Sequence, residues 1–330
     1  MVSGADLANH EFARKLIKRG VQVRVHGIAP PGLSTRMQSR QYFARGVPVC
    51  LVKSDFLKRL RDEIRTFKPD VVFTSCPEPN CGQDDMTRMV DVITSFDIPV
   101  VLYVHDIEGT LPLFAEAKNQ LAKVVTNSRF MAKRIAELWS RDAEVVYPVP
   151  DLKEYDKSSS TGRFITFFNP SHFKGQRIAN TLATERFKER PFLFVEGFID
   201  PDGHGIFLSR SGNLVHARRS PDVATIYVMT QTVIIPSQWE EPFGRIAVEA
   251  MHTGIPVIAS RTGGLEESVG EGGLLVDDFT NVDAWASAIE RLDDPRERKR
   301  VVKAGKQHVK QFSLSREVDK LIEILEQVSA

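Results

Sequence analysis

Residues 232–260 read TVIIPSQWEEPFGRIAVEAMHTGIPVIAS. The apolar run Thr232–Ser237 predicts a buried strand, and the run that ends at Ser260 predicts a second one. Between them, Gly244 closes a polar loop and opens a segment with helical character. A buried strand, a helix and another buried strand indicate a parallel sheet with helices on its faces, so this stretch predicts an α/β fold.

The same alternation of strands and helices extends along the whole chain. Apolar residues at helical spacing predict a first helix that Gly20 ends, followed by a strand at Val21–Val25 and a loop region over 29–46. A helix is also expected from Phe114 to Leu121. We expect a domain at 1–150, a polar linker at 151–162, a second domain at 163–312 and a terminal helix at 313–330.

Composition places the chain among ordinary globular proteins, with 330 residues, 42% hydrophobic and 26% charged. It has no run of eighteen apolar residues and no basic-then-apolar leader, so we expect a cytoplasmic protein without a membrane-spanning helix. Its three cysteines are Cys50, Cys76 and Cys81. Cys76 and Cys81 have the spacing of a metal or disulfide pair, but without a second ligand pair nearby we expect reduced, uninvolved thiols.

Positive charge is concentrated at the start of the chain. Eight Arg and Lys against Asp6 and Glu11 give residues 1–50 a net charge of +6, whereas the whole chain carries +1. These cations are either solvated helix faces or a surface for an anionic acceptor or an acidic membrane, which would make the protein peripheral at the inner membrane face. Only Tyr42 and Phe43 lie among the later arginines, so nucleic acid is not expected.

Two carboxylates flank the predicted loop-to-helix junction. Glu241 lies in the loop, and Glu249 lies eight positions later within the helix. The main chain of Phe243 and Gly244 can bring N–H groups to a helix N-terminus, where anions are favoured. N–H donors for phosphate together with carboxylates for hydroxyls suit a nucleotide sugar. Read singly, the glycine could be a plain turn and both glutamates solvated.

Taken together, Glu-Pro-Phe-Gly, Glu-Ala-Met and Gly-Ile-Pro-Val-Ile-Ala-Ser resemble the donor-site signature of retaining GT-B glycosyltransferases, in particular glycosyltransferase family 4. The resemblance implies two Rossmann-like, doubly wound parallel-sheet domains facing a cleft. The second domain would hold the donor, and the helix at 313–330 would return to the first. The family's opening strand is apparently absent, since the chain begins inside the turn that holds Gly4, an acceptor-side position.

The resemblance assigns roles to residues of the signature. Glu241 would bind the hydroxyls of the donor sugar, while the main chain of Phe243 and Gly244 would lie against the sugar and its phosphate. Glu249 would accept hydrogen bonds from both ribose hydroxyls. The turn at Gly263 and Gly264 would allow close approach of a phosphate, although a plain turn would look the same.

Other positions complete the implied site. Lys174 matches a family lysine on the donor diphosphate, where a cation stabilises the leaving group. Asn169 stands where the family usually has Arg, and Arg245 could supply the missing charge. His105 would contact the donor sugar, and Asp106 is a candidate for the acceptor. The base is expected near Leu214–His216.

The predicted activity is therefore that of a retaining hexosyltransferase (EC 2.4.1.-) of carbohydrate biosynthesis. It would transfer a hexose from a nucleotide-diphosphate sugar to a saccharide, lipid-linked or small-molecule hydroxyl. No Asp-x-Asp motif follows an apolar strand, so neither a divalent metal nor another cofactor is expected. The alternatives are a non-catalytic GT-B protein that binds a sugar or a partner, motivated by the absent strand and Asn169, and a nucleotide-sugar epimerase.

Overall fold

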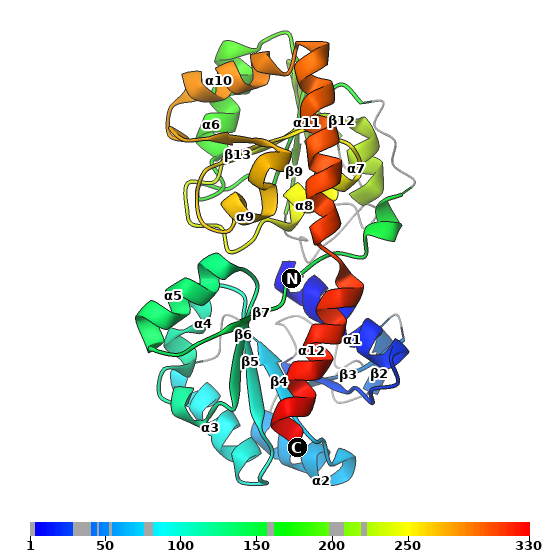
Figure 1. The fold of residues 1–330 in the computed structure, drawn as a ribbon, viewed down its shortest axis with the longest axis vertical. Coiled ribbons are helices and arrows are strands. Elements are labelled where there is room, and N and C mark those ends of the chain that lie inside the picture. Colours follow the sequence, from blue (N-terminus) through cyan, green and yellow to red (C-terminus); the bar gives the residue numbers. More distant parts are fainter. Residues whose placement is uncertain are drawn as a thin grey trace. The chain divides into compact units, whose positions relative to one another are not determined.

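A computed structural model of the chain describes residues 4–28, 41–44, 46–52, 55–75, 82–156, 162–197, 208–218 and 223–330. The chain forms two compact units (Figure 1). The N-terminal unit combines Ala5–Pro148 with Leu314–Ala330, and the C-terminal unit is built on Val149–Ser313. Each unit has a sheet of wholly or mainly parallel strands with helices packed against it, so the predicted α/β class is confirmed.

The N-terminal unit contains two sheets. Its elements are α1 (Gly4–Lys18), β1 (Val25–Ile28), β2 (Gln41–Ala44), β3 (Val47–Val52), α2 (Phe56–Phe67), β4 (Val72–Ser75), α3 (Gln83–Thr94), β5 (Val100–Val104), α4 (Ile107–Thr110), the 3₁₀ turns Pro112–Phe114 and Lys118–Gln120, β6 (Lys123–Thr126), α5 (Arg129–Trp139), β7 (Glu144–Val145) and α12 (Leu314–Ser329). One sheet is parallel, with the strand order β4-β5-β6-β7. The other has the order β1-β3-β2, in which β2 runs antiparallel to β3.

Helices connect these two sheets. Among the described residues no strand joins β1 to β4 by hydrogen bonds. Instead, Ala13 of α1 packs in a cluster with Val47 and Val49 of β3, while Phe12 of the same helix contacts the ring of Tyr103 in β5. The two sheets of the N-terminal unit are therefore held together through side-chain packing.

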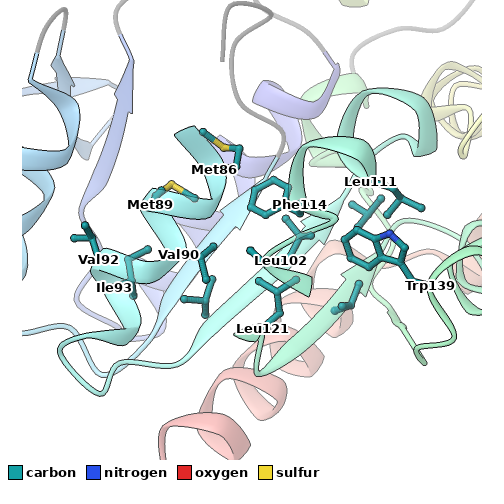
Figure 2. Close-up of a cluster of buried hydrophobic side chains, with 14 of the residues drawn as sticks. Met86, Met89, Val90, Val92, Ile93, Leu102, Leu111, Phe114, Leu121 and Trp139 are labelled. Atoms are coloured by element: carbon teal, nitrogen blue, oxygen red, sulfur yellow. The ribbon is translucent and has the colours of Figure 1, made fainter. Parts of the chain in front are cut away.

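The core of the N-terminal unit lies between the parallel sheet and α3 (Figure 2). Strand β5 is buried on both faces, as a central parallel strand requires. Leu102 points into the cluster shown in Figure 2, toward Phe114 and the apolar side of α3. Alternation turns Tyr103 to the opposite face, where its hydroxyl donates to the carbonyl of Val146 at 2.6 Å.

Helix α12 packs within the N-terminal unit, although it follows the C-terminal unit in the sequence (Figure 1). The Tyr147 N–H donates to the Glu317 carboxylate at 2.9 Å, and the Lys320 ammonium donates to the carbonyl of Val145 at 2.7 Å. Arg19, directly after α1, pairs with Asp319 at 2.9 Å. Polar contacts thus tie α12 both to the end of the parallel sheet and to α1.

The C-terminal unit has one mixed sheet of seven strands with the order β10-β11-β9-β8-β12-β13-β14, parallel except for β10. Its elements are a 3₁₀ turn (Leu152–Tyr155), β8 (Phe164–Phe168), α6 (Gln176–Thr181), a π turn (Leu182–Arg186), β9 (Phe192–Val195), β10 (Leu208–Ser211), β11 (Leu214–Ala217), α7 (Val223–Met229), β12 (Thr230–Ile235), α8 (Arg245–His252), β13 (Val257–Ser260), α9 (Leu265–Val269), a 3₁₀ turn (Gly270–Gly272), β14 (Leu274–Val276), α10 (Val282–Arg291), α11 (Pro295–His308) and a 3₁₀ turn (Val309–Gln311).

Both faces of this sheet are covered. Phe167 and Phe194 face a core shared with α6 and α10, whereas Leu193 and Val195 face a smaller core that includes Ile226 of α7. Alternate residues of the same strand thus enter different cores, as a doubly covered sheet requires. The fully buried Trp285 of α10 fixes its position by donating from its indole nitrogen to the carbonyl of Phe279 at 2.9 Å.

Three local predictions were wrong. The first strand is β1, Val25–Ile28, rather than Val21–Val25, because only its register with β3 is hydrogen-bonded. The predicted loop 29–46 contains strand β2, which pairs with β3 next to Gly46, a turn residue with φ of +87°. Residues 29–40 lie outside the described residues. The expected helix at Phe114–Leu121 is two 3₁₀ turns, since short i,i+3 turns suffice to bury its apolar side chains.

Candidate active site

Three loops of the C-terminal unit begin at the same edge of its sheet. Strands β8, β12 and β13 are adjacent and parallel, so their carboxyl ends lie side by side. The loops that follow them carry Asn169–Gly175, Pro236–Gly244 and Arg261–Gly264. The crevice outside the carboxyl ends of parallel strands is where open α/β sheets bind ligands. Most of the predicted donor residues therefore start from a single edge of one sheet.

Lys174 and Glu241 meet at this edge, coming from two of the loops. The Lys174 ammonium lies 2.5 Å from Oε1 of Glu241, and the hydroxyl of Ser237 donates to the same oxygen at 2.6 Å. Glu241 is buried, whereas 23% of the Lys174 side chain remains exposed. A buried carboxylate needs such partners, and the pair leaves the ammonium partly accessible to a ligand.

An indole ring contacts the same ammonium. The Lys174 nitrogen lies 4.9 Å from the centre of the Trp239 ring, within the range of a cation–π interaction. The indole nitrogen of Trp239 is buried and has no hydrogen-bond partner. Sequence reasoning did not assign roles to Ser237 or Trp239, although both lie within the quoted stretch 232–260. The orientation of Lys174 is thus set by a carboxylate and an aromatic face.

Glycines allow the three loops to pack against one another. A Cβ at Gly175 would lie 1.8 Å from the carbonyl oxygen of Pro236, and one at Gly264 would lie 2.2 Å from that of Pro242. A Cβ at Gly263 would lie 2.5 Å from the carbonyl oxygen of Glu241. In addition, the Gly264 N–H donates to that same oxygen at 2.6 Å. These glycines are therefore needed for contact between protein loops, and the Gly264 N–H already has a partner.

Helix α8 begins directly after the signature loop. Gly244 precedes it with φ of +98°, a left-handed conformation that favours glycine. The ring of Phe243 is buried and packs edge-to-face on Phe312 at 5.4 Å between centroids. Its side chain thus belongs to the core, and only the main chain of Phe243 is left for a ligand. The first turn of α8 offers backbone N–H groups of the kind that bind anions.

Glu249 lies inside α8 and is buried. Its Oε2 accepts a hydrogen bond from the hydroxyl of Tyr227 at 2.8 Å, and its Oε1 lies 4.0 Å from Nε of Arg245. Arg245, which was considered as a substitute for the missing charge at position 169, is therefore near a carboxylate of its own helix. Sequence reasoning missed Tyr227, which lies in a helix 22 residues earlier in the chain.

Asn169 has a left-handed backbone, with φ of +57°. Its N–H donates to the carbonyl of Val195 at 2.7 Å, and its side chain occupies the space next to Gly197. A Cβ at Gly197 would lie 2.3 Å from Cγ of Asn169. Asn adopts this conformation more readily than most residues, which gives a backbone reason for Asn where Arg was expected.

His105, which was predicted to contact the donor sugar, belongs to the N-terminal unit. His105 follows β5, is buried and stacks on Tyr103 at 4.2 Å between centroids. Its Nε2 lies 3.1 Å from Oδ1 of Asn9 in α1, and Asn9 also donates to the Ser75 hydroxyl at the end of β4. The carbonyl of His105 accepts from Asn127 at 2.8 Å. Adjacent strand ends thus bring His105 and Ser75 together through Asn9, which the sequence did not single out.

Three further positions have local structural roles. Asp106 caps α4 by accepting from the Gly109 N–H, and burial raises the pKa of its carboxyl above the usual range. Gly4 is the first residue of α1. Ser128 caps α5 by accepting from the Met131 N–H at 3.1 Å.

Comparison with known proteins identifies the family. The family model described as Glycosyltransferase Family 4 matches residues 2–154, and the model described as Glycosyl transferases group 1 matches residues 210–308. One match falls on each unit of the fold. The chain belongs to the glycosyltransferases that these two models describe.

Curated relatives of this glycosyltransferase match part of its length. A D-inositol 3-phosphate glycosyltransferase of Corynebacterium urealyticum is 36% identical over 120 residues, which are 36% of this chain and 28% of that protein. Spore coat protein SA of Bacillus subtilis is 32% identical over 109 residues, which are 32% of this chain and 29% of that protein. The matches therefore span less than a third of the length of these relatives.

Solved structures share the fold over nearly the whole chain. A glycosyltransferase from Rickettsia africae has a TM-score of 0.75 at 18% identity, covering 99% of this chain and 96% of that one. Anabaena Alr3699/HepE in complex with UDP-glucose has a TM-score of 0.78 at 19% identity, covering 98% of this chain and 96% of that one. These likenesses confirm the predicted GT-B fold.

Several remaining predictions for this glycosyltransferase concern other surfaces. Of the basic residues near its start, Arg19 pairs with Asp319, and Arg24 pairs with Glu63 at 2.9 Å. Arg36, Arg40 and Arg45 lie outside the described side chains, and so do Cys76 and Cys81. His216, near which the base of the nucleotide was expected, lies in β11 with its ring against Phe194.

Within the described part of the chain, none of the helices combines the length and apolar content needed to cross a bilayer.

Proposed function

We propose that this glycosyltransferase moves a hexose from a nucleotide-diphosphate sugar to a hydroxyl acceptor, with retention of the anomeric configuration. The observation that carries the proposal is the Lys174–Glu241 pair at the carboxyl edge of the sheet, 2.5 Å apart and still partly accessible at Lys174. Because Anabaena Alr3699/HepE is known in complex with UDP-glucose, a UDP sugar is the first donor to test.

Each donor residue has a role that its chemistry suits. Lys174 would stabilise the negative charge that develops on the leaving diphosphate, helped by the N–H groups that open α8. Glu241 would accept hydrogen bonds from hydroxyls of the transferred sugar, and Glu249 from those of the ribose. Lys174 would exchange part of its contact with Glu241 for the phosphate oxygens. In this arrangement the ammonium supplies the positive charge, so we propose a reaction without a catalytic divalent metal.

Retention would follow from attack on the face that the diphosphate leaves. The bond from the anomeric carbon to the phosphate oxygen breaks, and a bond from the same carbon to the acceptor oxygen forms. The proton of the acceptor hydroxyl passes to an oxygen of the leaving phosphate. Positioning and electrostatics would supply most of the rate enhancement, and His105 would contribute a contact to the donor sugar.

The acceptor is proposed only as a class. The relatives named D-inositol 3-phosphate glycosyltransferase suggest a polyol or saccharide hydroxyl, and a lipid-linked acceptor fits the same chemistry. We place this side of the reaction at the N-terminal unit, where Asp106 and Gly4 are candidates. A peripheral contact of its basic residues with an anionic membrane belongs to the same proposal.

A transfer assay tests this function. The purified chain is incubated with UDP-, GDP- and ADP-hexoses, with and without a panel of polyol and saccharide acceptors, and release of the nucleoside diphosphate is measured. Release that depends on an acceptor supports transfer, and the anomeric proton coupling of the product, read by NMR, shows whether configuration is retained. An inverted product would overturn the retaining mechanism while leaving transfer intact.

A non-catalytic sugar-binding protein is the second candidate. Two observations favour it: the uncharged Asn169 in place of a cation, and the absence of a strand between β1 and β4 among the described residues. In that case a nucleotide sugar would raise the melting temperature of the chain without turnover in any of the assays. Acceptor-dependent release of nucleotide would exclude it. Interconversion of the free nucleotide sugar would instead indicate the epimerase activity considered above.

A further inference from the structure

We propose that Tyr227 is a positioning residue for nucleotide binding, which holds one oxygen of Glu249 so that the carboxylate is presented in a fixed orientation to the ribose hydroxyls. This inference rests on the proposed function, because it takes the ribose of the donor as the partner of Glu249. It goes beyond that function by naming the side chain that determines ribose recognition.

The first observation is the contact itself. Tyr227 lies in α7 and Glu249 in α8, and the Tyr227 hydroxyl donates to Oε2 of Glu249 at 2.8 Å. Tyr227 is fully buried, and 7% of Glu249 is exposed. Burying a phenol hydroxyl has a cost unless the hydroxyl is hydrogen-bonded, and Phe would fill the same space without that cost. The hydroxyl is therefore needed for Glu249 rather than for packing.

The second observation is that the Tyr227 ring has little freedom to move. Phe168, the last residue of β8, lies against it at 5.5 Å between centroids, and Tyr155 packs against it edge-on at 5.9 Å. Side chains in close-packed interiors stay in single rotamers, so the hydroxyl is held at one point. A fixed donor at one carboxylate oxygen determines the plane of the whole carboxylate.

The third observation concerns charge. Burial raises the pKa of Tyr227 well above its usual value, and the nearby Glu249 carboxylate adds to the rise. Tyr227 therefore keeps its proton at all working pH values and remains a donor. On the other side, Oε1 of Glu249 lies 4.0 Å from Nε of Arg245. A carboxylate can accept several hydrogen bonds, so the bond from Tyr227 takes up only part of its accepting capacity.

The predicted consequence is a loss of ribose selectivity when the hydroxyl is removed. Tyr227→Phe keeps the ring and deletes the hydrogen bond to Glu249. Binding of the nucleoside diphosphate that the wild type prefers should weaken roughly tenfold, the effect of about 1.4 kcal/mol from a lost charged hydrogen bond. Binding of the matching 2′-deoxy and 3′-deoxy nucleotides should change little, because they no longer use Glu249 fully. A purely structural defect would weaken all three ligands alike.

The experiment is titration calorimetry on the full chain with UDP, GDP and ADP, followed by the deoxy forms of the best ligand. Tyr155→Phe is the matched control, since it makes the same chemical change beside Tyr227 and leaves the bond to Glu249 in place. It should keep the wild-type ratio between ribose and deoxyribose ligands. A Tyr227→Phe protein that keeps this ratio overturns the inference while the proposed function stands. A wild-type chain that binds none of the nucleotides overturns both.

A double-mutant cycle gives a second test of the same contact. Glu249→Gln keeps an acceptor for Tyr227 and removes the negative charge. If Tyr227 acts through Glu249, the two changes together should cost clearly less nucleotide affinity than the sum of the single changes. Additive losses would overturn the inference.

Discussion

The Lys174 ammonium forms an ion pair with the Glu241 carboxylate, with 2.5 Å between Nζ and Oε1. The two residues are 67 positions apart and come from loops that follow adjacent strands. Each has another contact, since Ser237 donates to Glu241 and the Trp239 ring lies beside Lys174. The pair is thus part of a small network that keeps a partly exposed cation and a buried anion in place before any ligand binds.

Lys174→Ala should reduce turnover far more than it changes the Michaelis constant of the donor. Removing one group that stabilises developing charge lowers kcat by about 10²-fold in other enzymes. The change also leaves a buried carboxylate without its counter-charge, so a lower melting temperature is expected as well.

Steady-state kinetics with the preferred donor provide the test. Lys188→Ala is the matched control, because Lys188 is an exposed lysine of the same unit and has no ion pair among the described residues. Lys174→Arg keeps a positive charge and should retain more activity than Lys174→Ala. Equal kcat in the wild type and Lys174→Ala would show that the leaving group is stabilised elsewhere.

The indole of Trp239 is expected to tune the same lysine. A cation–π contact is worth about 0.5–2 kcal/mol, so Trp239→Leu should lower kcat/KM several-fold, with Trp239→Phe intermediate. In the Lys174→Ala background, Trp239→Leu should have almost no further effect. An equally large effect in that background would mean that the ring acts independently of Lys174.

The sequence was sufficient to predict the fold, because its strongest signals are local. Strand β13 follows from a continuous apolar run and helix α12 from apolar residues at period 3.6, and burial in the structure agrees with both patterns. The β2–β3 hairpin was missed because a short edge hairpin carries a weak pattern, and its turn is marked by little more than Gly46.

The site was predictable only in part, for a different reason. Glu241 and Glu249 stand in a specific motif, but their partners come from other segments. Ser237 is four positions from Glu241, whereas Lys174 is 67 positions away and Tyr227 is 22 positions from Glu249. A periodic pattern records which face a residue occupies and not which side chain it meets. Contacts between loops therefore required the structure.

Gly264→Ala should destabilise the C-terminal unit for a steric reason. The backbone of Gly264 has an ordinary φ of −70°, but a Cβ would lie 2.2 Å from the carbonyl oxygen of Pro242. Backbone atoms cannot move aside as a flexible side chain can, so the loop must shift, at a cost of about 1–3 kcal/mol.

Thermal unfolding of Gly264→Ala should therefore begin several degrees below that of the wild type, and activity should fall as Glu241 moves. The control is Gly82→Ala, where φ is −89° and the nearest atom to a Cβ, Oδ2 of Asp85, is 3.8 Å away. That variant should behave like the wild type. If both variants unfold at the wild-type temperature, the loops do not pack as described.

Glu317→Gln should change how stability depends on pH. Burial is the main cause that raises the pKa of Glu317 above its usual 4.5, while the Tyr147 N–H and the charge of Lys320 act in the opposite direction. The folded chain therefore binds this proton more tightly than the unfolded chain does. The contribution of Glu317 to stability is complete below pH 4.5 and is lost as the pH rises through the raised pKa.

Glutamine keeps an acceptor for Tyr147 and carries no charge at any pH. The melting temperature of Glu317→Gln should thus equal or exceed that of the wild type at pH 7, and the difference should shrink toward pH 4.5. Melting curves of the wild type and Glu317→Gln, recorded from pH 4.5 to pH 7, test this expectation. A variant that is less stable at neutral pH would show that the ion pairing of Glu317 outweighs its burial.

Replacing Asn169 with Arg should fail to increase activity, although it restores the residue type expected at this position. The left-handed backbone at Asn169, with φ of +57°, disfavours Arg by about 1–2 kcal/mol, and the side chain at this position lies next to Gly197. Asn169→Gly, in contrast, suits the backbone and should keep most of the stability. Melting temperatures and kcat of the two variants, measured with the preferred donor, give the comparison. If Asn169→Arg folds normally and its kcat rises, a second cation is what the site lacks, and the backbone explanation for Asn169 is wrong.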